Sequence, residues 1–207
     1  MFILLLTPPE FIPDEVQLLE QLFEAGLSTL HVRKPNASLE QIEDFIRQFK
    51  PQYMKRLVLH SQYQLMAKYN IKGIHLTTHV WEELQEQGQL KEYIRPVQRR
   101  GLTVSASIHK FEEILKMPSK LDYVFLSPFF DSISKPGYKA AISPEAVEDF
   151  VFNNSKVPPI VALGGIELNN IHLLKNKNIT GVALLGSVWQ ATSPVDAFSE
   201  IQMALSS

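Results

Sequence analysis

The sequence predicts an α/β fold, a single (β/α)8 barrel of the TIM type, because strand-like and helix-like segments alternate along the chain. The strand-like segments are short apolar runs bounded by turn residues. They cover Phe2–Leu6, Thr29–Val32, Leu57–Leu59, Gly73–Leu76, Leu102–Ala106, Tyr123–Leu126, Ile160–Leu163 and Val182–Leu185. With 207 residues, each strand-helix unit has about 26 residues, which fits a compact barrel. An open doubly wound sheet is the competing architecture.

Helices are predicted between the strands from apolar spacing and from capping residues. Val16, Leu19 and Leu22 recur at the spacing of one helix face. Ser38 precedes Gln41 by the spacing of a capping box. Two further helix starts are marked by a proline after a serine: Ser143-Pro144 and Ser193-Pro194.

One segment, Thr77–Leu90, has a less regular pattern and contains Gly88. It is predicted to be a loop with one helical turn. No linker or low-complexity stretch divides the chain, so residues 1–207 are predicted to form one domain.

Composition and charge exclude several classes of protein. Hydrophobic residues make up 45% and charged residues 20%, as in globular rather than disordered chains. A formal net charge of -2 gives no positive field for nucleic acid or a membrane, so neither partner is expected. The absence of cysteine suits a reducing, cytoplasmic location. Met1–Leu6 is too short for a signal peptide or a membrane span, and homo-oligomer formation is left open.

Glycine turns follow the seventh and eighth predicted strands, where barrels commonly hold phosphate. Gly164-Gly165 and Gly186-Ser187 each stand at a strand-to-helix turn. Glycine lets an anion approach backbone N–H groups closely, and the start of a helix is positive. Together these turns predict a phosphate-binding site, although each alone also fits a tight turn.

A polar loop after the sixth predicted strand carries Ser132, Ser134 and Lys135. Two hydroxyls and an ammonium group would bind an anionic substrate well. A solvated surface loop is the alternative, and the expected position beside the glycine turns makes these residues candidates for substrate binding.

Arg33 follows the second predicted strand, on the same face as His31. If that face is the barrel interior, the arginine needs an anionic partner, because an unpaired buried charge is costly. Either a substrate anion or a carboxylate of the protein would serve, so Arg33 is a candidate substrate-binding residue.

Ser107 and His109 end the fifth predicted strand and are expected at the rim of the barrel. Histidine exchanges protons near neutral pH, so His109 is the candidate catalytic acid or base, and Ser107 is a candidate substrate-binding residue. A structural or helix-capping histidine is the alternative for His109.

Several histidines lie near the ends of consecutive predicted strands: His31, His60, His75, His79 and His109. Neither a helix with the HxxxH spacing nor a carboxylate at ligand spacing accompanies them. The sequence therefore predicts no metal-binding residues.

Seven segments together carry a resemblance to a known family through their order and spacing. They are Leu30-His31-Val32-Arg33, Gly73-Ile74-His75-Leu76, Val104–His109 with Glu112-Glu113, Asp122-Tyr123-Val124, Ser127-Pro128, Ser132–Lys135 and Ala162–Ile166. Over nearly its full length the chain resembles the thiamine-phosphate synthase and TenI-like thiazole tautomerase family.

The resemblance implies a phosphate-binding TIM barrel acting on carboxythiazole phosphate, a small phosphorylated thiazole of thiamine biosynthesis. Tautomerases of the family shift a proton so that the thiazole becomes aromatic, and they need no cofactor. Synthases join the thiazole phosphate to hydroxymethylpyrimidine diphosphate and release pyrophosphate with the help of Mg²⁺. A barrel that only binds phosphate ligands in a regulatory role is a further alternative.

Departures from the synthase pattern lie where its metal site is expected. After the third strand the synthase pattern has Asn-Asp, whereas this chain has His60-Ser61. After the fourth strand the pattern has Asp, whereas this chain has Thr77–Val80. The synthase pattern also has a Gln-x-Arg-x-Lys run. In this chain His31 stands in place of the glutamine, and the lysine, Lys34, comes one position earlier and so lies on the other face of the strand. Mg²⁺ prefers carboxylate oxygens. We therefore expect a metal-independent thiazole tautomerase, an isomerase, with His109 carrying the proton.

Overall fold

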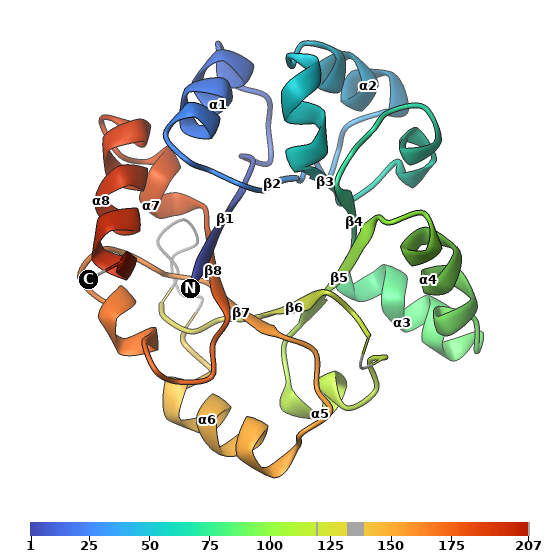
Figure 1. The fold of residues 1–207 in the computed structure, drawn as a ribbon, viewed down its shortest axis with the longest axis vertical. Coiled ribbons are helices and arrows are strands. Elements are labelled where there is room, and N and C mark those ends of the chain that lie inside the picture. Colours follow the sequence, from blue (N-terminus) through green and yellow to red (C-terminus); the bar gives the residue numbers. More distant parts are fainter. Residues whose placement is uncertain (119, 132–138, 207) are drawn as a thin grey trace.

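Parallel strands close into an eight-stranded barrel in the computed structural model, which describes residues 1–118, 120–131 and 139–206 (Figure 1). Each strand pairs with its neighbours in chain order, and β1 pairs with β8 to close the sheet. The strands are β1 Phe2–Leu6, β2 Leu30–Val32, β3 Leu57–Leu59, β4 Gly73–Leu76, β5 Thr103–Ile108, β6 Tyr123–Leu126, β7 Ile160–Leu163 and β8 Gly181–Leu184. The predicted (β/α)8 barrel is confirmed, and the open sheet is excluded.

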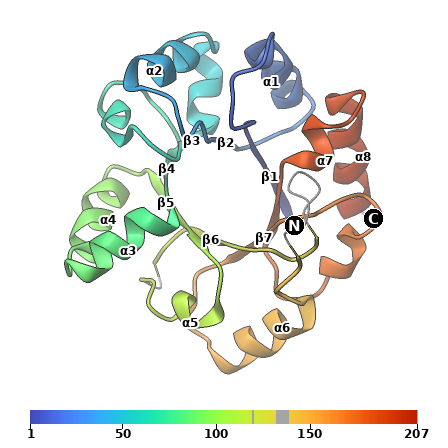
Figure 2. The same cartoon turned by 180° about the vertical axis from the view of Figure 1, so that it is seen from behind.

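Helices surround the barrel on its outside, as both faces of the molecule show (Figures 1 and 2). They are α1 Glu15–Glu24, α2 Leu39–Arg47, α3 Thr78–Glu86, α4 Leu90–Arg99, α5 Phe111–Ile114, α6 Pro144–Asn153, α7 Gly186–Trp189 and α8 Pro194–Ser206. Short 3₁₀ segments occupy Pro51–Arg56, Tyr63–Ala67 and Ile171–Leu174. The expectation of an α-helix after every strand is therefore wrong at β3 and β7, because 3₁₀ turns follow these two strands. None of the helices formed by the described residues has both the length and the apolar character needed to cross a bilayer.

Capping residues begin α2 and α6 where the sequence predicts them. Ser38 Oγ accepts a hydrogen bond from the Gln41 backbone N–H, and Gln41 Oε1 accepts one from the Ser38 N–H, which completes a capping box. Ser143 Oγ accepts from the Ala146 N–H at the start of α6. These bonds satisfy backbone donors that a helix cannot pair internally.

The prediction of a loop at Thr77–Leu90 is wrong, because α3 is a regular helix over most of this segment. Its Trp81 side chain is buried, and the indole N–H donates to the Ser107 carbonyl at 2.8 Å. This contact with β5 provides a tertiary anchor that the local pattern does not reveal. Gly88, with φ of 68°, lies just beyond the end of the helix.

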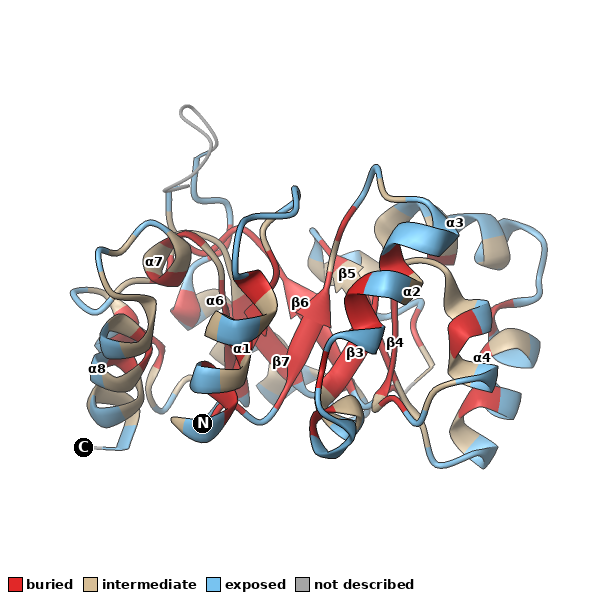
Figure 3. Cartoon of the chain, turned by 90° about the horizontal axis from the view of Figure 1, so that it is seen from above, coloured by how far each residue is buried: buried red, intermediate tan, exposed pale blue. Residues whose placement is uncertain are grey.

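Apolar side chains pack on both faces of the barrel wall, and the strands and the inward faces of the helices are buried (Figure 3). The larger cluster lies between the strands and the helices. The smaller cluster comprises Leu4, Leu6, Tyr123, Phe125, Val161 and Ala183. Strand register and side-chain alternation place these six residues inside the barrel. Because the strands are parallel, their carboxyl ends share one rim, where barrel enzymes carry their functional residues.

Candidate functional site

Three histidines from neighbouring strands meet inside the barrel: His31 on β2, His60 just after β3, and His75 on β4. His31 is paired in register with Leu6 of the interior cluster, so its side chain shares that inward face. His31 Nδ1 lies 2.8 Å from His60 Nε2, and the His60 and His75 rings stack with centroids 4.2 Å apart. The exposed fractions are 0%, 7% and 0%, so only His60 keeps any contact with solvent.

Hydroxyl groups surround the outer nitrogens of this cluster. His31 Nε2 lies 2.8 Å from the Tyr123 hydroxyl. His75 Nδ1 and Nε2 lie 2.8 Å from the hydroxyls of Ser105 and Ser107, respectively. Ser107, a predicted substrate-binding residue, is thus half-buried at the rim and hydrogen-bonded to a histidine.

Burial keeps the three imidazoles neutral. Loss of water around the ring lowers the pKa of His31 and of His60 well below the usual value, and lowers that of His75 to about 3. The positive charge of Arg33 lowers the pKa of His60 and His75 further. Each ring therefore carries one proton and one lone pair near neutral pH.

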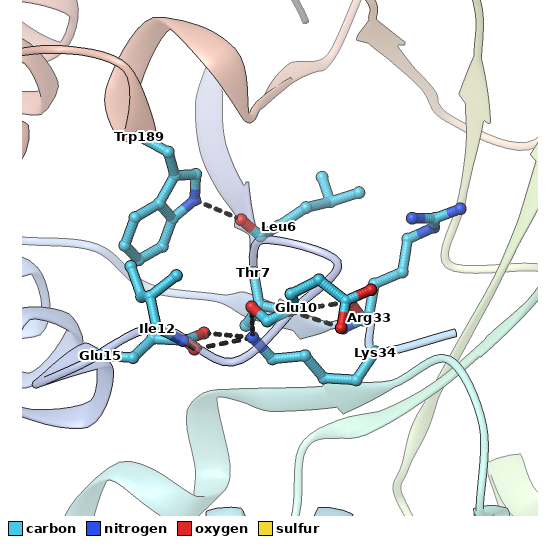
Figure 4. Close-up of polar contacts among 8 residues, drawn as sticks. All are labelled: Leu6, Thr7, Glu10, Ile12, Glu15, Arg33, Lys34 and Trp189. Atoms are coloured by element: carbon cyan, nitrogen blue, oxygen red, sulfur yellow. Dashed lines mark hydrogen bonds and ion pairs between the residues drawn. The ribbon is translucent and has the colours of Figure 1, made fainter. Parts of the chain in front are cut away.

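The side chains of Arg33 and Lys34 point in different directions from the end of β2 (Figure 4). Lys34 forms a buried salt bridge with Glu15 of α1, with Nζ 2.7 Å from Oε2. Arg33 is half-buried, and its backbone N–H donates to Thr7 Oγ1 at 2.9 Å. The salt bridges found among the described residues do not include Arg33. An ion pair with a carboxylate of the protein was one alternative for Arg33. In the structure the neighbouring residue, Lys34, forms such a pair.

His109 lies just after β5 with its side chain exposed. Its backbone N–H donates to Glu113 Oε2 at 2.9 Å, at the start of α5. Its ring Nδ1 lies 3.2 Å from both the carbonyl and the hydroxyl oxygen of Ser127, which follows β6. Held through Nδ1, the ring has Nε2 available for proton exchange with a ligand at the rim.

The glycine turn after β7 packs directly against the segment after β6. Gly164 and Gly165 have φ of 100° and 64°, in the region that favours glycine. A Cβ atom on Gly165 would lie 2.2 Å from the Asp131 carbonyl oxygen and 2.7 Å from Phe130. No larger residue fits this turn without moving the neighbouring segment.

The turn after β8 leads directly into the short helix α7, whose first residues are Gly186 and Ser187. Ser187 Oγ is buried, and among the buried side-chain nitrogen and oxygen atoms of residues 1–118, 120–131 and 139–206 it is the one without a hydrogen-bond partner. The Trp189 indole N–H donates to the Leu6 carbonyl at 2.7 Å and thereby fixes α7 against the end of β1 (Figure 4). An unpartnered buried hydroxyl in the first turn of a helix, where backbone N–H groups have no intrahelical partner, is suited to an anion.

The three remaining predicted binding residues, Ser132, Ser134 and Lys135, lie outside the described residues. His79, the fifth histidine noted in the sequence, is exposed on α3 and takes no part in the interior cluster.

The residues present at the ends of β3 and β4 do not fit Mg²⁺. Among the described residues, the one group of potential metal ligands close enough to share an ion consists of His31, His60 and His75 and contains no carboxylate. Magnesium favours carboxylate and other oxygen ligands and retains several waters. An imidazole set is therefore the wrong chemistry for it.

Sequence reasoning missed the convergence of the three histidines and their contact with Tyr123. Alternation along each strand gives a partial signal, since it places His31 on the same face as Arg33. The register between strands, which brings the rings together, appears only in the closed sheet.

Comparisons with known proteins identify the family. A model of the family described as thiamine monophosphate synthase matches residues 3–188. The thiamine-phosphate synthase of Citrobacter koseri is 25% identical over 194 residues, covering 91% of this chain and 87% of that protein. The thiamine-phosphate synthase of Bacteroides fragilis is 24% identical over 185 residues, covering 86% of this chain and 87% of the relative.

Solved structures show the same fold. A thiamine phosphate pyrophosphorylase from Bacteroides thetaiotaomicron has a TM-score of 0.75 at 24% identity, covering 100% of this chain and 98% of that one. A thiamine phosphate pyrophosphorylase from Pyrococcus furiosus has a TM-score of 0.77 at 20% identity, covering 99% and 95%. Because the family model spans nearly the whole barrel, the chain belongs to the thiamine monophosphate synthase family.

Proposed function

We propose that this protein is an enzyme of thiamine biosynthesis that binds the phosphate of a carboxythiazole phosphate at the turns after β7 and β8. The observation that carries the proposal is the buried, unpartnered hydroxyl of Ser187. A hydroxyl left unbonded in the interior is costly, and a phosphate oxygen would accept its hydrogen bond. The glycine turn at Gly164-Gly165 supports it, because this turn follows β7, which pairs with β8, and barrels commonly hold phosphate at the turns after these two strands. Membership of the family supports this class of substrate.

The first candidate reaction is the synthase reaction, in which the thiazole phosphate is joined to hydroxymethylpyrimidine diphosphate and pyrophosphate is released. The names of the relatives favour this reaction over the tautomerase expected from the sequence. Arg33 supports it, because this cation at the end of β2 makes no salt bridge among the described residues and would bind a diphosphate.

The second candidate reaction is proton transfer that makes the thiazole aromatic. His109 favours it, since its exposed ring is held through Nδ1 against Ser127. The donor set at the ends of β3 and β4 also favours it, because it does not fit the Mg²⁺ that the synthase reaction is expected to use.

Two assays on the same protein separate these reactions. Unaromatised carboxythiazole phosphate is supplied alone and aromatisation is followed optically. Hydroxymethylpyrimidine diphosphate is then added with and without Mg²⁺, and thiamine phosphate is measured. Formation of thiamine phosphate establishes the synthase, and aromatisation alone establishes the tautomerase. Binding without either reaction would overturn the proposed enzyme and leave a regulatory barrel.

A binding experiment tests the phosphate site independently of the reaction. Thiazole phosphate should raise the melting temperature, while the dephosphorylated alcohol should do little, because only a ligand that favours the folded state stabilises it. Ser187→Ala should reduce the shift without lowering the melting temperature of the free protein, because the hydroxyl has no partner to lose.

Ser143→Ala is the matched control for Ser187→Ala, since Ser143 Oγ caps α6. This variant should lower the melting temperature of the free protein and leave the ligand-induced shift unchanged. Equal shifts with the phosphate and the alcohol would argue against the site.

A further inference from the structure

The three histidines inside the barrel each have one ring nitrogen within 4.8 Å of the corresponding nitrogens of the other two. We propose that His31, His60 and His75 form a binding site for a divalent transition metal ion of the Zn²⁺ class. The site is distinct from the phosphate cradle at β7 and β8, and the proposal does not depend on the proposed function.

The ligand set matches this class of ion. Imidazole suits zinc, copper, iron and nickel, whereas magnesium selects oxygen ligands. Three protein ligands with an open fourth position are typical of zinc sites that bind water or substrate. The three rings are buried, and each offers one nitrogen to this group.

The hydroxyl groups around the cluster provide partners for the nitrogens that would not bind the ion. A metal-binding histidine usually donates its second ring N–H to a fixed acceptor. When His31 binds through Nδ1, its Nε2–H can donate to the Tyr123 hydroxyl. When His75 binds through one nitrogen, the other can donate to Ser105 or Ser107.

The spacing of His31 and His60 requires only a small adjustment. Their nitrogens Nδ1 and Nε2 are now 2.8 Å apart and share one proton in a hydrogen bond. Zinc-nitrogen bonds of about 2.0–2.1 Å at a tetrahedral angle would separate the two nitrogens by about 3.3 Å. Side-chain rotation supplies a movement of this size, and the ion would enter past His60, the ring with some solvent contact.

The test is a metal titration of protein prepared without a histidine tag and stripped with a chelator. Co²⁺ is the probe, because its visible absorption is intense in a four-coordinate site and weak in a six-coordinate one. We expect one Co²⁺ per chain with the intense spectrum, and its loss on addition of Zn²⁺. A weak six-coordinate spectrum, or no binding at about millimolar Co²⁺, would overturn the proposal.

Variants assign the binding to the cluster. His31→Gln and His60→Asn introduce residue types that the synthase pattern carries at these positions, so the barrel interior should accept them. Tyr123→Phe removes a hydrogen-bond partner of one ligand and should lower Co²⁺ affinity by roughly 10- to 100-fold. Each of the two ligand variants should lower the affinity by more than that. His172→Gln is the matched control, because His172 is exposed on the 3₁₀ segment Ile171–Leu174. Unchanged affinity in both cluster variants would contradict the assignment.

A measurement on the wild-type protein covers the case in which the variants do not fold. Zn²⁺ should shift the ¹⁵N imidazole signals of His31, His60 and His75 and leave those of His79 and His172 in place. Shifts confined to the exposed histidines would show that the ion binds the surface, and the proposal would then be wrong.

Discussion

Lys34 Nζ lies 2.7 Å from Glu15 Oε2, and the two side chains are only 1% and 2% exposed. The same ammonium donates to the Glu10 carbonyl at 2.8 Å, a polar contact drawn in Figure 4. It also lies 4.7 Å from the centre of the Phe11 ring. Burial lowers the pKa of Lys34 and raises that of Glu15, and each partner offsets part of the other's shift. The pair joins β2 to α1 and keeps Lys34 away from the barrel mouth.

Breaking this pair from one side should be more damaging than replacing both partners. Lys34→Met leaves the Glu15 carboxylate buried without its cation, and we expect the free energy of unfolding to fall by about 3–5 kcal/mol. The double variant Lys34→Met with Glu15→Gln should recover much of that loss, because no charge remains buried. Urea unfolding followed by circular dichroism measures both. The single variant Glu15→Gln completes the comparison, and a double variant whose loss equals the sum of the two single losses would show that the charges do not interact.

Substitution of Gly165 tests the close packing of the turns after β6 and β7. Gly165→Ala should destabilise the protein and weaken phosphate binding, because its Cβ would overlap the Asp131 carbonyl. Gly101→Ala is the matched control, since Gly101 has φ of 75° but no atom within 4 Å of the added methyl group. The free energy of unfolding of the control should fall by only roughly 1–2 kcal/mol, the cost of a non-glycine residue in the left-handed conformation. Equal losses in urea unfolding would mean that the overlap is relieved at no cost.

Substitution of His109 tests its role as the proton carrier. In the aromatisation assay, His109→Ala should lower kcat by about 10²- to 10⁴-fold, the usual contribution of a general acid or base, with phosphate binding nearly unchanged. His79→Ala serves as the control, because His79 is exposed on α3. A wild-type rate of aromatisation in His109→Ala would assign the proton transfer to another group.

Stability at alkaline pH should depend on Tyr123. Burial raises the pKa of this phenol far above its usual value of 10.0, so the folded protein keeps the proton while the unfolded chain releases it above that pH. The unfolded state then binds fewer protons, and stability should fall as pH rises above 10.0, by up to about 1.4 kcal/mol per pH unit.

Tyr123→Phe removes this titration and should give a shallower decline. The variant should also be less stable at neutral pH, because His31 Nε2 loses its partner. Urea unfolding at a series of pH values compares the two proteins. Parallel declines would show that Tyr123 does not contribute to the alkaline loss.

Much of the barrel could be predicted from the sequence, because strands and helices differ in apolar period over a few residues. Five of the predicted strands, such as β1 Phe2–Leu6 and β7 Ile160–Leu163, have the observed bounds. The caps at Ser38 and Ser143 are equally local, since each bonds a backbone group three residues away. Helix α3 was missed because burial of Trp81 stabilises it, and burial depends on the rest of the fold.

The sequence by itself determined the elements, their order and the glycine turns at one rim, since these depend on backbone preferences over short segments. The tertiary structure decided which side chains meet. His31 and His60 are 29 residues apart in the chain, and their contact depends on the pairing of β2 with β3 in one register. Lys34 finds Glu15 only because α1 packs over the end of β2. Long-range pairing of this kind is set by closure of the sheet, for which no short segment of sequence carries a signal.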